Sequence, residues 1–99
     1  MNYKLTEDAK ADLKRIYRRG FIEFGEARAD QYYLDIIERF EQLSEHPESY
    51  PAVDHIAKSM RRSVCGRDTI YYEMVDTGIL ILFILGSQDI KRRLKQLRT

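Results

Sequence analysis

Few side chains in this sequence are placed where they could make or break covalent bonds. His46 and His55 are nine residues apart on a proline-containing stretch, and no HxxxH or CxxC pair accompanies them, so their spacing predicts no metal site. Ser63 and Ser87 lack a nearby histidine with a third orienting group, which argues against a serine nucleophile. Cys65 is the single cysteine and has no disulfide partner within the chain. We therefore expect no catalytic residue, no metal and no cofactor.

Two adjacent arginines are better candidates for a functional role. Arg61 and Arg62 lie in a run that predicts a strand, so one side chain should face the covered side of the sheet and the other should face outward. A charged side chain that faces a core must be paired or lie at the rim of the sheet. Each arginine either makes a structural ion pair or grips an anion or a partner's carboxylate through its guanidinium. Tyr71 and Tyr72, on the next predicted strand, fit strand packing better than ligand binding.

The elements that must position these residues are three short strands. Residues 60–65, 70–75 and 79–85 are apolar, β-branched and aromatic runs. Turn signals separate them at 66–68 and 76–78, which is typical of antiparallel strands joined by hairpins. The third run is apolar at every position, so this strand is central and covered twice or has a second face that awaits a partner.

Two helices and an edge strand are predicted before this meander. Residues 3–5 form a short extended run, and Thr6 then caps a helix that ends near Gly25. A second helix, from about 26 to 44, stops at His46-Pro47. Because almost no loop joins the helices, they must be antiparallel neighbours that pack on the same face of the sheet. We expect the other face to be open to a partner.

The end of the chain predicts a short basic helix that begins after Ser87. Such a helix is marginal alone, so it either folds over the open sheet face or waits for a partner. Charge is segregated along the chain: residues 1–19 carry six basic and three acidic side chains, residues 20–59 carry three and nine, and residues 60–99 carry eight and four. The basic parts either present a positive surface to a partner or only solvate the protein.

Length and composition indicate a single α+β domain spanning residues 1–99, with a helical hairpin on a small, mainly antiparallel sheet. The longest apolar run, residues 79–85, is too short for a membrane span, and the first ten residues contain no apolar core of a secretory signal. The expected location is the cytoplasm. Ile22 and Leu34 fall outside the apolar helical stripes, and Tyr32 lies at the border of one. These three residues are either ordinary exposed side chains or partner contacts.

The order of these elements, and the residues that fill them, resemble the ParE branch of the RelE/ParE toxin superfamily. The similarity covers nearly the whole chain and rests on short motifs, none of them specific alone. The motifs lie at Leu5–Leu13, Phe24–Glu26, Ala29–Tyr32, Phe40–Pro47, Arg61–Gly66, Ile70–Tyr72 and Leu82–Asp89.

This resemblance implies a RelE/ParE-like β-α-α-β-β-β-α fold and the toxin of a type II toxin–antitoxin pair in bacterial cytoplasm. ParE-like toxins poison DNA gyrase without being enzymes, and a ParD-like antitoxin wraps and neutralises them. The toxin reaches operator DNA only through the antitoxin. We expect antitoxin contacts on the strands and the helical hairpin, from Tyr17, Phe21, Tyr32, Arg61, Arg62 and Tyr72. Target contacts are expected on the C-terminal helix, from Lys91, Arg92, Arg93 and Lys95.

The alternative function is that of the RelE branch, which cuts messenger RNA on the ribosome. That reaction requires basic residues on the central strands and a proton-transfer group near the C-terminus. Either Arg61 or Arg62, together with Arg67, would meet part of the first requirement. The third strand is followed by residues 86–89, with the sequence Gly-Ser-Gln-Asp, and neither Tyr nor His occurs after Tyr72. The sequence therefore favours the gyrase poison over the nuclease.

Overall fold

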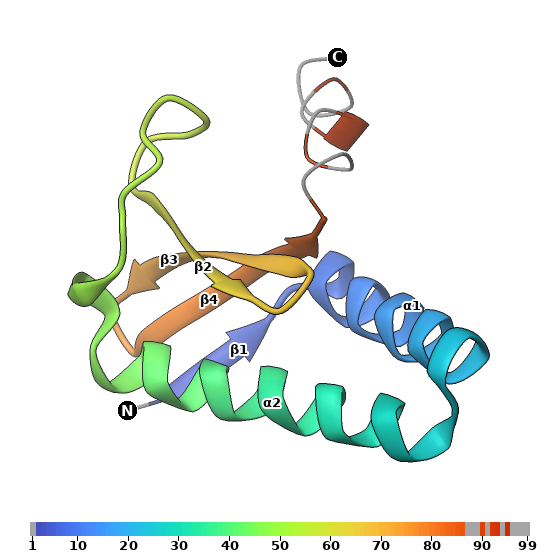
Figure 1. The fold of residues 1–99 in the computed structure, drawn as a ribbon. Helices are drawn as coiled ribbons and strands as arrows, with labels where there is room; N and C mark the ends of the chain where they lie inside the picture. Colours follow the sequence, from blue (N-terminus) through green and yellow to red (C-terminus); the bar gives the residue numbers. More distant parts are fainter. Residues whose placement is uncertain (1, 87–89, 91, 94, 96–99) are drawn as a thin grey trace.

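The computed structural model describes residues 2–86, 90, 92–93 and 95, and confirms the predicted α+β architecture (Figure 1). Its elements follow the order β-α-α-β-β-β. They are β1 (Asn2–Leu5), α1 (Glu7–Phe24), α2 (Glu26–Glu45), the short 3-10 helix η1 (Pro47–Ser49), β2 (Met60–Cys65), β3 (Asp68–Val75) and β4 (Gly78–Leu85). The predicted C-terminal helix falls partly on residues outside this description. Its described residues Ile90, Arg92, Arg93 and Lys95 have a helical backbone.

The four strands form one mixed sheet in the order β1-β4-β3-β2. The predicted meander is present, because β3 pairs antiparallel with both β2 and β4. The edge strand β1 pairs parallel with β4, from Asn2 opposite Gly78 to Leu5 opposite Ile81. A Cβ atom on Gly78 would lie 1.9 Å from the backbone oxygen of Asn2, so only glycine allows the two backbones to approach this closely. The apolar third strand is therefore central, as expected.

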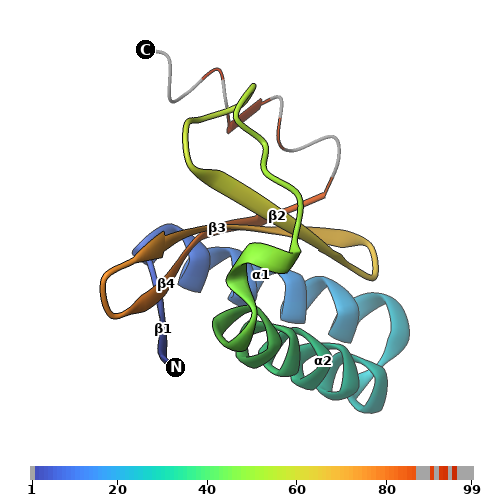
Figure 2. The same cartoon turned by 90° about the vertical axis from the view of Figure 1, so that its left-hand side faces the viewer.

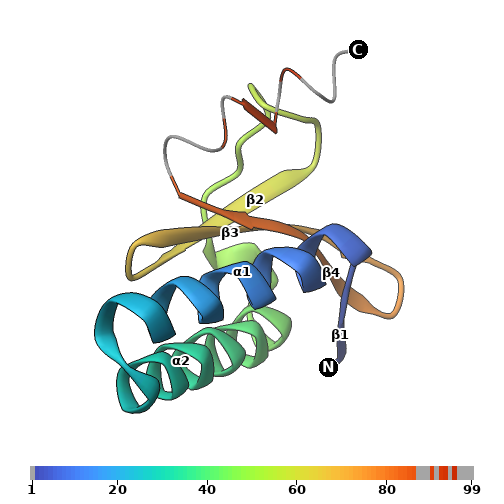
Figure 3. The same cartoon turned by 90° about the vertical axis from the view of Figure 1, so that its right-hand side faces the viewer.

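The two helices form an antiparallel hairpin that covers one face of the sheet (Figure 3). Thr6 caps α1, since its hydroxyl oxygen accepts a hydrogen bond from the Ala9 amide at 3.0 Å. The same hydroxyl donates to the Leu82 carbonyl at 2.6 Å and so ties the start of α1 to β4. Gly25 is the single residue between the helices, and its φ of 90° is a conformation that glycine adopts readily.

Side chains of β4 enter two separate apolar clusters. Ile79, Ile81 and Ile84 pack with the helices, while Phe83 and Leu85 pack on the other face of the sheet. The second cluster also contains Val53, Met60 and Tyr71, with Ile56, Ala57, Leu82 and Ile90 packed against it. In Figure 2 the helical hairpin lies below the sheet, and the connection between η1 and β2 rises above it.

The expectation of an open second face is therefore wrong. Phe83, Tyr71 and Leu85 are at most 5% exposed, because the connection between η1 and β2 folds over them. This connection is anchored by a hydrogen bond from the Val53 amide to the Met60 carbonyl at 2.8 Å. Neither helix in the described part of the chain combines the length and apolarity needed to cross a membrane.

Candidate protein-binding site

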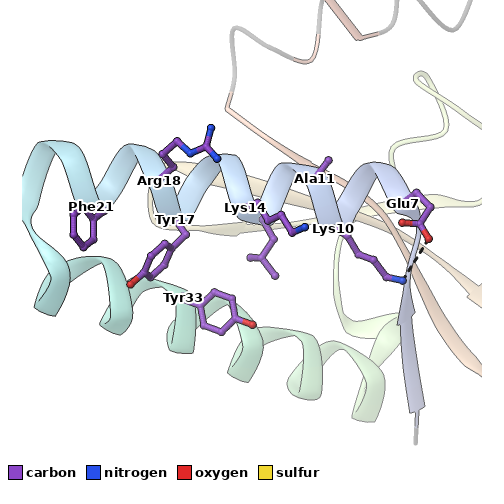
Figure 4. Close-up of a pocket in the computed structure, with 9 residues that line it drawn as sticks. Glu7, Lys10, Ala11, Lys14, Tyr17, Arg18, Phe21 and Tyr33 are labelled. Atoms are coloured by element: carbon purple, nitrogen blue, oxygen red, sulfur yellow. Dashed lines mark ion pairs between the residues drawn. The ribbon is translucent and has the colours of Figure 1, made fainter.

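A surface groove of about 750 Å³ runs along the hairpin between α1 and α2 (Figure 4). Most of its lining comes from one face of α1, where side chains three and four residues apart lie side by side. Tyr33 of α2 completes the lining from the opposite side. The lining residues, here called the hairpin groove, are Glu7, Lys10, Ala11, Leu13, Lys14, Tyr17, Arg18, Phe21 and Tyr33.

Three aromatic rings occupy one end of the hairpin groove. The Tyr17 ring lies 6.3 Å from that of Phe21 and 6.2 Å from that of Tyr33, the latter pair being perpendicular. The Tyr17 hydroxyl donates to Asp30 Oδ1 at 2.6 Å, and this hydrogen bond is the largest cause of the raised pKa of Tyr17. Phe21 is 48% exposed and Tyr33 is 38% exposed. The site thus presents aromatic surface to solvent beside a fixed hydroxyl.

Cations line the α1 side of the hairpin groove. Lys10, Lys14 and Arg18 are spaced four residues apart, so they form one row along the helix. Glu7 is the only acidic lining residue, and its 3.5 Å ion pair with Lys10 is exposed and therefore weak. An apolar floor with a basic rim is suited to an amphipathic segment that carries acidic side chains. No covalent chemistry is indicated by this lining.

The structure places the six predicted antitoxin contacts on different surfaces. Tyr17 and Phe21 share the hairpin groove. Tyr32 instead faces the turn between β2 and β3, with its hydroxyl 2.9 Å from Asp68 Oδ2 and 2.8 Å from the Cys65 carbonyl oxygen. Burial and the hydrogen bond to Asp68 raise the pKa of Tyr32. Tyr32 also lines a smaller pocket of about 290 Å³ next to Gly66.

Arg61 and Tyr72 lie on the helix-covered face of the sheet and hold the segment after α2. Arg61 donates to the Tyr50 carbonyl at 2.7 Å, and the Tyr72 hydroxyl donates to the Pro47 carbonyl at 2.7 Å. Tyr72 is 0% exposed, and burial raises its pKa to about 12. With no exposed surface, Tyr72 is a core residue in this structure. The sequence predicts that the arginine on the covered face is paired or lies at the rim of the sheet. Arg61 lies on the edge strand β2 and binds backbone carbonyls, not an acidic helix residue.

Arg62 has the opposite orientation, as the strand alternation predicted. It is exposed, and its register partner Tyr71 belongs to the cluster on the second face. Burial raises the pKa of the Tyr71 hydroxyl, and the nearby Arg62 guanidinium counteracts part of that rise. Arg62 is therefore separated by the sheet from Arg61 and from the hairpin groove.

The C-terminal cations also differ among themselves. Lys91 lies outside the described residues. Arg92 and Lys95 are exposed. Arg93 Nη2 is 3.0 Å from Asp12 Oδ1, and Arg93 Nη1 is 3.5 Å from Asp8 Oδ2. Arg93 is thus already engaged within the chain, which removes it from the set of cations available to a target in this conformation.

Sequence reasoning missed several residues that matter at these sites. Lys10 and Lys14 carried a signal, since their four-residue spacing with Arg18 is visible in the sequence. Asp12 also had a recognisable signal in the sequence, because its spacing places it between Ala9 and Ile16 on the apolar face of α1. In the structure Asp12 is 4% exposed. Asp68, 1% exposed, gave no such signal because a turn residue is expected to be polar. Among the described residues no group of three or more His, Cys, Asp or Glu side chains could hold a metal ion.

Comparisons with known proteins agree with this fold. A family model described as "ParE toxin of type II toxin-antitoxin system, parDE" matches residues 3–90. A solved structure titled "Chromosomal ParDE TA system from P. aeruginosa" is similar, with a TM-score of 0.76 and 23% sequence identity. That match covers 87% of this chain and 95% of the other chain. None of the curated protein sequences shows significant similarity to this chain.

Proposed function

Because this chain belongs to the family of ParE toxins of type II toxin–antitoxin systems, we propose that it poisons DNA gyrase in the bacterial cytoplasm and is neutralised by a ParD-like antitoxin. In this proposal the toxin acts by binding and has no catalytic residue. It contacts operator DNA only through the antitoxin. The family supports an antitoxin as the class of partner, and the surface of the chain supports the site that we propose for it.

The antitoxin site is proposed to be the hairpin groove, and its exposed aromatic floor with a basic rim is the observation that carries this assignment. Exposed rings such as Phe21 and Tyr33 are energetically useful once a partner excludes water from them. Lys10, Lys14 and Arg18 favour a partner whose residues next to the groove are acidic. An antitoxin tail that is disordered alone and folds as an acidic amphipathic helix meets both requirements.

Substitution in the groove tests this assignment. We expect Phe21→Ala to weaken the complex with the antitoxin by at least about tenfold, because an exposed aromatic anchor is lost. Leu34→Ala is the matched control, since Leu34 is an equally exposed apolar residue of the same hairpin that does not line the groove. Titration calorimetry with a ParD-like antitoxin measures both affinities. Equal affinities of the two variants would contradict the groove as the site.

The target requires a separate assay. We expect the purified chain to inhibit supercoiling by gyrase and to increase linear DNA in a cleavage reaction, and the antitoxin to reverse both effects. The exposed Arg92 and Lys95 are the described residues proposed to contact the gyrase–DNA complex. Truncation after Ser87 should abolish the inhibition, and an unchanged effect would exclude the C-terminal segment from the mechanism.

The same preparation distinguishes the nuclease alternative. Arg62 is exposed on the second face, whereas Arg61 is engaged with backbone carbonyls. Arg62→Ala therefore tests a catalytic role with less risk to the fold than Arg61→Ala. Cleavage of ribosome-bound message that depends on Arg62, together with unaffected gyrase, would replace the proposed function by the endoribonuclease.

A further inference from the structure

The strongest contacts of the C-terminal segment (the described residues Ile90, Arg92, Arg93 and Lys95) are made by a single side chain. The Arg93 guanidinium carbon lies 5.6 Å from the centre of the Phe83 ring, which allows a cation–π contact. The same guanidinium binds Asp12 at 3.0 Å and Asp8 at 3.5 Å. Arg93 thus connects β4 and the first turns of α1, which it reaches from the other end of the chain.

The carboxylate that receives Arg93 is buried and is itself held in place. Asp12 Oδ2 accepts a hydrogen bond from the Ile84 amide at 3.0 Å, while Asp12 Oδ1 accepts from Arg93. Arg15 lies 3.9 Å from Asp12 Oδ1, but it donates at 3.1 Å to the Ile84 carbonyl. Asp12 is 4% exposed and the Arg93 side chain is 20% exposed. A pair this far from solvent is screened less than a surface ion pair.

We propose that Asp12 and Arg93 form a latch that holds the C-terminal segment against the second face of the sheet. Two independent contacts agree with this arrangement: Ile90 packs against the apolar cluster of Phe83, Leu85 and Tyr71, and Arg93 lies over Phe83. Opening the latch leaves the buried Asp12 carboxylate with only the more distant Arg15, which already donates to the Ile84 carbonyl, and this loss is unfavourable. The closed position is therefore the stable one in the free chain.

The latch gives the cations of the segment different roles. Arg93 is a positioning residue, because its charge is neutralised by Asp12 and Asp8 within the chain. Arg92 and Lys95 are exposed, and the latch fixes the position on the surface at which a partner meets them. This consequence rests on the proposed function, whereas the latch itself is a property of the free chain. A test on the free chain therefore separates failure of the latch from failure of the gyrase assignment.

Amide hydrogen exchange of peptides covering residues 86–99 of the full-length chain measures the latch. We expect Asp12→Asn and Arg93→Gln each to accelerate exchange there by roughly fivefold, as loss of a partly buried ion pair predicts. The side-chain oxygen in Asp12→Asn can still accept the hydrogen bond from the Ile84 amide. This variant therefore removes the charge and preserves the hydrogen bond between α1 and β4. The double variant should exchange no faster than Arg93→Gln alone, because Asp12→Asn removes an ion pair that Arg93→Gln has already removed.

Two neighbouring substitutions are the controls. Arg92→Gln removes one positive charge from the same segment, and Glu23→Gln removes one negative charge from α1 at a side chain that pairs with Arg67 and not with Arg93. Both should leave the exchange near that of the unmodified chain. Unchanged exchange in Asp12→Asn and Arg93→Gln, additive effects in the double variant, or equal acceleration by the Arg92 control would each overturn the latch.

Discussion

Two buried carboxylates organise this small domain at the level of single residues. Asp12 connects α1 to β4, and Asp68 connects the β2–β3 turn to both helices through Arg19 and Tyr32. The Arg19–Asp68 ion pair is 3.0 Å long, with Asp68 1% exposed. Asp68 Oδ1 has no hydrogen-bond partner within the described part of the chain. The hydrogen bonds to Asp68 Oδ2 must therefore compensate most of the cost of burying this charge.

Removal of one of these bonds should be measurable. Tyr32→Phe deletes the hydroxyl 2.9 Å from Asp68 Oδ2. We expect the free energy of unfolding to fall by about 1–3 kcal/mol, the range for hydrogen bonds that involve buried or charged groups. Tyr33→Phe is the matched control, because Tyr33 is the adjacent tyrosine, is 38% exposed, and should change stability by less than about 0.5 kcal/mol. Urea unfolding measures both, and equal losses would contradict the role of the Tyr32 hydroxyl.

Tyr72 predicts a dependence of stability on alkaline pH. Its pKa in the folded chain is about 12, above the ordinary value of 10.0, because burial disfavours the phenolate. Between these two values the unfolded chain loses the proton first, so this contribution to stability is complete below pH 10 and is lost as pH rises towards 12. Thermal unfolding between pH 9 and 12 should show a decline that is smaller in Tyr72→Phe. An identical decline in that variant would assign the effect to other groups.

At the level of elements, close approach of backbones determines which strands can pair. The edge strand β1 can pair with the central strand β4 because Gly78, at φ 144°, has no side chain to meet Asn2. The two helices are less close to each other at Gly20. A Cβ on Gly20 of α1 would lie 3.7 Å from Ala29 of α2, which is an ordinary contact distance. The structure therefore has no room for a side chain at Gly78 but has room for a methyl group at Gly20.

This difference predicts opposite effects of the same substitution. Gly78→Ala should destabilise the protein by more than about 2 kcal/mol, because it combines an unfavourable backbone conformation with a collision against β1. Gly20→Ala should stabilise it by about 0.5–1 kcal/mol, since alanine is the better helix former and the space exists. Chemical unfolding of both variants tests the pair. A stable Gly78→Ala protein would show that β1 is dispensable for the sheet.

At the level of the whole molecule, the two surfaces that we propose for partners lie on different sides of the sheet. The hairpin groove lies on the helices, and the C-terminal segment meets the opposite face of the sheet. Helix α1 contributes to both: Lys10 and Lys14 line the groove, whereas Asp8 and Asp12 bind Arg93 of the C-terminal segment. The groove is rimmed by cations although the formal net charge of the chain is only +1. Association with an acidic antitoxin should therefore depend on local charge and not on the total charge.

Ionic strength tests this arrangement. We expect the association rate with the antitoxin to fall as the salt concentration rises from about 50 to about 500 mM, because the Debye length shortens from roughly 14 Å to roughly 4 Å and the charges are screened. In the Lys14→Gln, Arg18→Gln double variant this dependence should be weaker, while the dissociation rate changes little. Arg62→Gln is a control of the same chemistry on the other face of the sheet. Stopped-flow mixing measures all three, and equal salt slopes would contradict steering by the groove.

The sequence by itself determined the elements of this protein. Period-two runs, turn residues and the Thr6 and Gly25 caps predicted every strand and both long helices, because these signals are local in the chain. It also predicted that Arg61 and Arg62 have opposite orientations and that Ile22 and Leu34 are exposed, since both follow from helix and strand geometry.

Only the tertiary structure decided what these elements bring together. Three features join residues from separate elements. The connection before β2 covers the second sheet face, Tyr72 is buried, and Arg93 pairs with Asp12, 81 positions away in the sequence. Tyr33 of α2 stays 38% exposed beside Tyr17 and completes the hairpin groove from the second helix. Periodicity shows which face of a helix is apolar, but packing decides how much of that face is covered.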